Sequence, residues 1–138
     1  MTRVVLDASV MVACLFKDGS ARRILLHDSE TTFLVPPGIQ EEAASQLSRV
    51  SRRTGLPPET VRSVLEDLLR HVEVIPMRRL RSVEMRARKV ARDAGDENDW
   101  EYVALSWIEV APIWTYDADF SRMHGVRTIS SAELAGKT

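Results

Sequence analysis

Short apolar runs alternate along this chain with longer segments in which apolar residues recur every three or four positions. The first run, Val4 to Leu6, has the length of a buried strand, and the segment after Pro58 has the clearest helical spacing. This pattern predicts strands at 3–6, 31–35, 72–75, 112–116 and 126–129. It predicts helices at 9–16, 21–27, 39–51, 58–70, 79–93 and 96–108, with a closing helical turn at 130–135.

Strands that alternate with helices indicate an α/β fold with a largely parallel sheet covered on both faces. At 138 residues the chain is most simply one domain, 1–138, and it shows no internal repeat, low-complexity segment or linker. In such sheets, binding sites form beyond the carboxyl ends of the strands. Asp7 and Asp117 each follow a predicted strand and therefore fall at that edge.

The composition predicts a cytoplasmic protein with no membrane segment. The longest apolar run, from Val10 to Phe16, is too short to cross a bilayer, and the strand pattern begins too early to leave room for a signal peptide. Cys14 is the single cysteine, so an internal disulfide is excluded, and its apolar neighbours predict a core position.

The basic residues are informative through their distribution, because the formal net charge is only -1. Nearly all are arginines, whose planar guanidinium matches phosphate oxygens, and they gather near Arg49 and again between Arg78 and Arg92. Solvated helix faces are the alternative explanation. The candidates for RNA binding are Arg78, Arg79, Arg81 and Arg86.

Four acids stand where one predicted element gives way to the next: Asp7, Glu42, Asp99 and Asp117. Carboxylates that converge repel one another, and a hard divalent cation with oxygen ligands is the usual remedy. Each acid taken singly could instead cap a helix, and Asp96 with Asp99 has the spacing of such a cap. Capping, however, does not require the acids to share one end of the sheet, whereas a metal site does.

Helical geometry favours Glu42 over its neighbour Glu41. At 100° per residue, the apolar residues of the predicted helix 39–51 centre on one direction, from which Glu42 lies roughly 95° and Glu41 about 165° away. Glu41 is therefore expected to face solvent. Glu42 is expected on the shoulder of the buried face, where its side chain can reach over the sheet edge.

Four segments in order resemble the PIN domain family, which includes the VapC-like ribonuclease toxins of prokaryotic toxin–antitoxin pairs. They are LDAS at 6–9, Glu42 after Pro36-Pro37, GDENDWEYVAL at 95–105 and WTYDADF at 114–120. The resemblance spans the chain. It implies a Rossmann-like three-layer α/β/α sandwich with a central, mainly parallel sheet of about five strands, and a Mg²⁺ or Mn²⁺ site of three or four acids.

The resemblance also implies roles for individual residues. Asp7, Glu42, Asp99 and Asp117 match the family's catalytic acids and metal ligands. Asp96 belongs to a D-x-x-D variant and is either an extra ligand or only a cap. Thr115 and Asp119 lie in the T-x-D-x-D-F motif as supporting residues, and Trp100 departs from the family pattern because smaller residues are common there.

The activity implied is metal-dependent hydrolysis of RNA phosphodiester bonds, leaving 5′-phosphate and 3′-hydroxyl ends. The implied partners are RNA, a second copy of the chain and a small antitoxin. Alternatives are an RNA-processing nuclease that is not a toxin, and a PIN-like module that binds RNA or protein without cutting. A phosphohydrolase or phosphoacceptor that uses Asp7 as nucleophile is disfavoured. Such families usually place a second acid one or two residues after the first and a lysine late in the fold. Here Ala8 and Ser9 follow Asp7, and Lys137 is the only late lysine. The histidines, His27, His71 and His124, share no ligand-like spacing.

Overall fold

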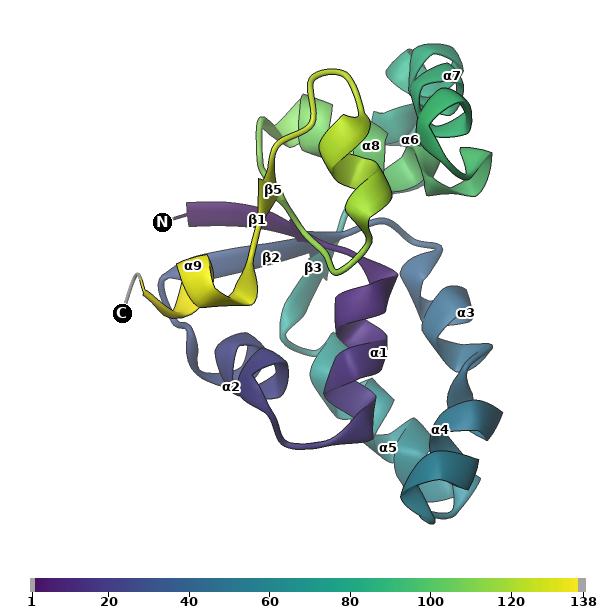
Figure 1. The fold of residues 1–138 in the computed structure, drawn as a ribbon, viewed down its shortest axis with the longest axis vertical. Helices are drawn as coiled ribbons and strands as arrows, with labels where there is room; N and C mark the ends of the chain where they lie inside the picture. Colours follow the sequence, from purple (N-terminus) through teal and green to yellow (C-terminus); the bar gives the residue numbers. More distant parts are fainter. Residues whose placement is uncertain (1, 137–138) are drawn as a thin grey trace.

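The computed structural model describes residues 2–136, so Lys137 lies outside the described residues. A five-stranded sheet with every neighbouring pair parallel crosses the middle of the molecule (Figure 1). Its spatial order is β3-β2-β1-β4-β5. The strands are β1 (Thr2–Leu6), β2 (Thr31–Val35), β3 (Val72–Val74), β4 (Ile113–Trp114) and β5 (Thr128–Ile129).

Helices cover both faces of the sheet, which confirms the predicted three-layer α/β/α sandwich. On one side lie α1 (Ala8–Phe16), α2 (Ser20–His27), α3 (Ile39–Ala44), α4 (Leu47–Thr54), α5 (Pro58–Leu69) and α9 (Ser131–Ala135). On the other lie α6 (Met77–Leu80), α7 (Glu84–Ala94) and α8 (Trp100–Glu109) (Figure 1). Short 3₁₀ turns, η1 (Arg81–Val83), η2 (Glu97–Asp99) and η3 (Ala118–Arg122), join the elements of this second layer and lead on to β5.

The strand order changes direction beside β1. The chain proceeds from β1 outward to β2 and β3, then returns to place β4 and β5 on the other side of β1. Helices that leave two adjacent strands in opposite directions open a crevice between the strands' carboxyl ends, where ligands bind in sheets of this kind. Asp7 follows β1 and Thr115 follows β4, so the LDAS and WTYDADF segments meet at this switch point.

Three predicted long helices are interrupted. The segment 39–51 is wrong as one helix, because Gln46 N–H bonds the carbonyl of Ala43 three residues back, and the tightened turn separates α3 from α4. The segment 79–93 divides at η1, and η2 precedes α8 where a single helix was expected from residue 96. The four apolar residues that defined the inner face of 39–51 are nonetheless all buried: Ile39, Ala43, Leu47 and Val50.

The core lies on both sides of the sheet and is built from the apolar residues of the strands and the inner helix faces. Phe33 and Trp114 pack across the sheet with ring centroids 5.5 Å apart. Cys14 is fully buried among these residues, as expected, and burial raises the pKa of its thiol to about 12, so the thiolate is scarce at neutral pH. Within residues 2–136, no helix has the length and apolarity needed to span a bilayer.

Val110 holds a strained backbone at the end of α8, with φ 50° and ψ 51°. This left-handed conformation is costly for a β-branched residue and easy for glycine. The Val110 side chain is 81% exposed, so little packing would be lost on its removal. We expect Val110→Gly to raise the free energy of unfolding by about 1 kcal/mol, measured by urea denaturation. Ser63→Gly, at an exposed ordinary helical position in α5, should lower stability, and a loss in both variants would contradict the strain argument.

Candidate active site

Asp7 is the buried acid at the centre of the site. It directly follows β1, is 5% exposed, and its Oδ2 accepts hydrogen bonds from Ser9 Oγ at 2.8 Å and Thr115 Oγ1 at 2.6 Å. Burial raises the pKa of this carboxyl, and the negative charge of Asp117 adds to that, whereas the two hydroxyl donors act in the opposite direction. Asp7 is thus held in one orientation by residues from two neighbouring strand ends.

The segment after β4 continues this hydrogen-bond network. Thr115 Oγ1 accepts from the backbone N–H of Asp117 at 2.9 Å, and Asp117 Oδ1 accepts from the N–H of Asp119 at 2.9 Å. Asp117 therefore caps η3 with one oxygen. The helix predicted at 9–16 begins one residue earlier, at Ala8, and Ser9 Oγ accepts from the N–H of Tyr116 at 3.1 Å. Its hydroxyl ties the ends of β1 and β4 together.

Glu42 reaches the site from α3, on the opposite side of the sheet from α8. Although much of its side chain is exposed, its Oε1 accepts a hydrogen bond of 2.8 Å from the buried hydroxyl of Tyr102 on α8. Partial burial raises the pKa of Glu42, the charges of Asp7, Glu101 and Asp96 reinforce the rise, and the Tyr102 hydrogen bond opposes it.

Asp99 connects all the candidate acids electrostatically. It is the last residue of η2 and directly precedes α8. Its pKa is raised to about 7, first by burial and then by the charges of its acidic neighbours: Asp7, Asp117, Asp96 and Glu42. Because charges perturb one another in this way only at short range, Asp99 lies within electrostatic reach of acids from all four segments. The Asp96 side chain accepts from the N–H of Asn98 at 2.9 Å and so caps η2.

We call Asp7, Glu42, Asp96, Asp99 and Asp117 the acid cluster. Its donors suit a hard divalent cation, because they are carboxylate oxygens with neighbouring hydroxyls and include no sulfur or imidazole. Desolvation and mutual repulsion raise the pKa of Asp7, Glu42 and Asp99, and a bound cation would relieve both costs. In residues 2–136, no three Asp, Glu, His or Cys side chains are placed so that together they could hold a metal ion. The chemical type of the donors fits such an ion, and the set of residues that binds it stays a prediction.

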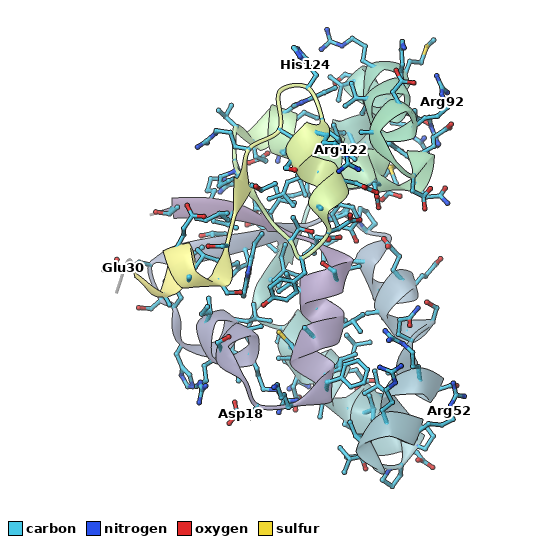
Figure 2. All side chains as sticks on the ribbon, viewed as in Figure 1. Asp18, Glu30, Arg52, Arg92, Arg122 and His124 are labelled. Atoms are coloured by element: carbon cyan, nitrogen blue, oxygen red, sulfur yellow. The ribbon has the colours of Figure 1, made fainter. Side chains whose placement is uncertain are left out.

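Asp119 is engaged by a basic residue of the same 3₁₀ turn, Arg122, which is labelled in Figure 2. Its carboxylate forms an ion pair with Arg122, and it lies so close to Gly95 that a Cβ on that glycine would overlap it. Arg122 also donates to the carbonyl of Ala94 at 3.3 Å, which ties η3 to the end of α7. The predicted supporting role of Asp119 is therefore indirect in this structure, through the position of η3 and hence of Asp117.

The four arginines predicted to bind RNA lie on α6, η1 and α7, and two have carboxylate partners. Arg79 pairs with Glu109 at 2.6 Å and Arg81 with Glu84 at 2.6 Å. The structure gives no such partner to Arg78 or Arg86 among the residues it describes. Arg86 lies over the Trp107 ring, 5.7 Å from the ring centroid. These two remain the candidates with guanidinium groups available for phosphate.

Two features of the site escaped the sequence interpretation. The first is Tyr102 on α8, to which the sequence pattern assigned no role. The second is a groove of about 370 Å³ beside the acids, between α1, α3 and α4. Its lining residues are Ala8, Ser9, Val12, Glu42, Ser45, Gln46 and Arg49. Arg49 belongs to the first arginine patch of the sequence. Its place in this groove depends on the packing of α4 against α1, which the sequence pattern does not reveal.

The fold and the site define a parallel α/β domain with an acid cluster at the switch point of its sheet. The model of the PIN domain matches residues 5–136, so the chain belongs to the PIN domain family. This confirms the resemblance stated above. Among curated proteins, none matches the chain significantly.

Solved structures of other proteins share this fold. The structure described as VapBC2 from Rickettsia felis bound to a DNA fragment from their promoter superposes with TM-score 0.74 at 18% identity, covering 94% of this chain and 98% of that one. PAE2754 from Pyrobaculum aerophilum gives TM-score 0.70 at 16% identity, covering 98% of this chain and 96% of that one. At these identities the likeness establishes the fold alone.

Proposed function

We propose that this protein is a metal-dependent endoribonuclease and the toxin of a toxin–antitoxin pair. The observation that carries the proposal is the electrostatic coupling of Asp99 to four other acids at the switch point of the sheet. PIN domains are generally nucleases, and every core acid of the resemblance is present in this chain. The acid cluster therefore supports phosphodiester hydrolysis rather than a module that only binds.

In this proposal Asp7, Asp99 and Asp117 hold Mg²⁺ or Mn²⁺, and Glu42 takes part directly or through water. Asp96 is a further ligand candidate. When bound, such an ion would lower the pKa of a water molecule and offset negative charge on the phosphate. Hydrolysis would leave 5′-phosphate and 3′-hydroxyl ends. Ser9 and Thr115 orient the Asp7 carboxylate, and Tyr102 orients Glu42. These hydroxyl donors hold the ligand oxygens in place before an ion arrives.

RNA is the proposed substrate, because the family resemblance points to ribonucleases and arginines flank the acid cluster. Arg49 lines the groove that opens beside Glu42, and Arg78 and Arg86 lie in the layer of α6 and α7. Guanidinium groups at these positions would hold phosphates by charge, so affinity should fall with salt. Arg79 and Arg81 would need to exchange a carboxylate partner for phosphate.

The toxin role draws on the fold shared with a chain of the VapBC2 structure. By that likeness we propose a cytoplasmic homodimer inhibited by a small antitoxin, and the acid cluster suits a partner that inserts a cationic side chain. An RNA-processing nuclease that is not a toxin would carry the same acids. Expression of the chain with and without its genomic neighbour distinguishes the two roles, because only a toxin arrests growth when expressed alone.

The test of the activity is cleavage of a mixed pool of structured and single-stranded RNA by the purified chain. We expect endonucleolytic cuts with Mn²⁺ or Mg²⁺ and no cuts with EDTA, and restoration when the metal is returned in excess. End-group analysis should find 5′-phosphates. RNA that is bound but stays intact with every metal would instead indicate the non-catalytic binding module.

A further inference from the structure

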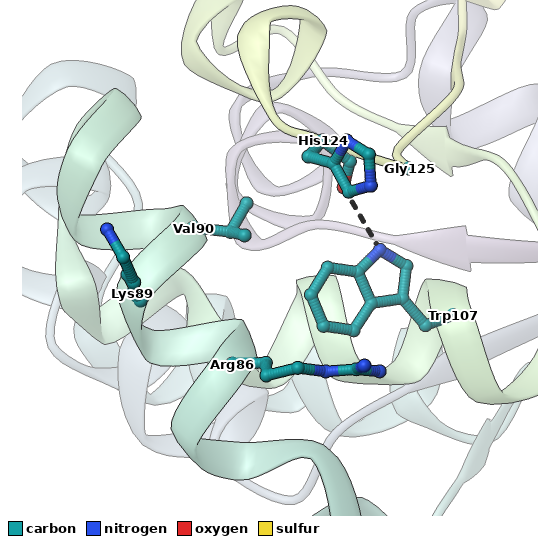
Figure 3. A pocket seen from close by; sticks show the side chains of 6 residues that line it. All are labelled: Arg86, Lys89, Val90, Trp107, His124 and Gly125. Carbon is teal, nitrogen blue, oxygen red and sulfur yellow. Dashed lines mark hydrogen bonds between the residues drawn. The ribbon is translucent and has the colours of Figure 1, made fainter.

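A cavity of about 510 Å³ lies in the layer of α7 and α8, outside the acid cluster. Figure 3 shows Trp107 between the Arg86 side chain and His124, with Val90 and Lys89 on the adjoining helix. Its lining residues are Arg86, Lys89, Val90, Trp107, His124 and Gly125. The cavity combines an aromatic ring with two cationic side chains, and none of its lining residues belongs to the acid cluster.

The Trp107 ring is held in a fixed position by the loop after η3. Its Nε1 donates to the carbonyl of His124 at 3.2 Å. Gly125 has a φ of +72°, and a Cβ at that residue would lie 2.9 Å from the indole nitrogen. Only glycine suits both the backbone conformation and this close approach. On the other side, the Arg86 guanidinium stands 5.7 Å from the ring centroid. The cavity thus has a preformed platform of an indole and a guanidinium.

The charge of the platform is suited to phosphate. Arg86 has no carboxylate partner in the described part of the chain, whereas Lys89 is paired with Asp93 at 2.7 Å. A second cavity of about 300 Å³ shares Val90 and His124 with the first and is also lined by Asp93, Ala94 and Arg122. Arg122 is the partner of Asp119, two residues from Asp117. The two cavities together extend from the platform to Arg122.

The spacing between Asp99 and Trp107 suits a nucleotide that flanks the cleaved bond. Asp99 and Trp107 are eight residues apart at the start of α8 and along it, which corresponds to about 12 Å of helix. A base bound at Trp107 therefore cannot belong to the phosphate at the acids, and must lie further along the same strand. A flexible single strand has every base free to stack in this way.

We propose that the Trp107 cavity is a subsite for one unpaired RNA base next to the cleaved phosphodiester. The base stacks on the indole and guanidinium, and its phosphate contacts Arg86 or Lys89. This inference rests on the proposed function, because it assigns part of the RNA substrate of that site. Stacking of this kind accepts every base, so the subsite favours single strands over duplex without selecting a sequence.

The test measures binding of an eight-nucleotide RNA of mixed sequence, and of the same RNA with every base removed, by fluorescence anisotropy. Asp7→Asn with EDTA serves as the background, so that the RNA stays intact. Adding Trp107→Leu should weaken binding of the base-containing RNA by about tenfold or more and leave the abasic RNA unaffected, and Trp107→Phe should restore part of the loss. Arg86→Gln should weaken the binding of both RNAs and reduce the number of ions released on binding by about one. Arg23→Gln on α2 should do neither.

Equal losses for both RNAs, or no loss for either, would overturn the subsite. Should Trp107→Leu fail to fold, the tryptophan emission of the chain with Trp107 intact decides: the base-containing RNA should quench it and the abasic RNA should not, and equal emission with both overturns the inference. Cleavage separates the two proposals. Wild-type cleavage with an unchanged KM in Trp107→Leu removes the subsite alone, whereas base-dependent binding without cleavage under any metal removes the nuclease alone.

Discussion

Asp7→Asn should lower the rate of RNA cleavage at least about 1000-fold while the protein stays folded. Asp7 is the most buried of the candidate acids and receives both hydroxyl donors, so the loss of its charge removes the ligand that the surrounding network is built to orient. A thousandfold loss corresponds to about 4 kcal/mol of transition-state stabilisation, within the range of a metal's contribution to phosphate chemistry. Single-turnover cleavage in saturating Mn²⁺ measures the effect.

Asp119→Asn provides the matched control, because it changes an equivalent charge two residues from Asp117. Its carboxylate is paired with Arg122, so we expect cleavage to fall by less than about tenfold. Titration calorimetry should show weaker Mn²⁺ binding in Asp7→Asn and near-normal binding in Asp119→Asn. Similar losses of activity in the two variants would contradict the geometry described here.

The sequence was sufficient to predict the strand that leads to Asp7. The run Val4 to Leu6 followed by Asp7 predicts a buried strand that ends in a carboxylate, and the structure has that arrangement. Four short apolar runs elsewhere in the chain correspond to the other strands, although β4 is only two residues long. Its pairing stops at Trp114 because the hydroxyls of Ser9 and Thr115 take over the backbone N–H groups of Tyr116 and Asp117.

Tertiary contacts were beyond the sequence. The sequence pattern assigns no role to Tyr102 on α8, and only the meeting of α3 with α8 shows that its hydroxyl reaches Glu42. The same holds for Gly125, whose chain position indicates a turn but not its contact with Trp107. Local pattern predicts which face of a helix is buried, whereas the partner across the sheet edge depends on how the layers pack.

Asp99 offers a test in which stability and function move in opposite directions. In the folded protein its pKa is about 7, against an ordinary value of 3.8, so the folded state holds the proton more tightly than the unfolded chain. The stability gained from this group is complete below about pH 4 and is lost as the pH rises through about 7. At pH 8 without metal, the ionised Asp99 therefore destabilises the fold.

Asp99→Asn should accordingly raise the free energy of unfolding at pH 8 in EDTA by about 1–2 kcal/mol, less than the full shift because the carboxylate is only partly buried. The gain should shrink toward zero near pH 4, where Asp99 is protonated. Mn²⁺ should raise the melting temperature of the wild type more than that of Asp99→Asn, since a ligand stabilises the state that binds it. Asp93→Asn is the control with the opposite sign, because the Lys89 ion pair lowers the pKa of Asp93. A loss of stability in Asp99→Asn at pH 8 would show that the acids do not repel one another, and the case for a cation at the switch point would fall with it.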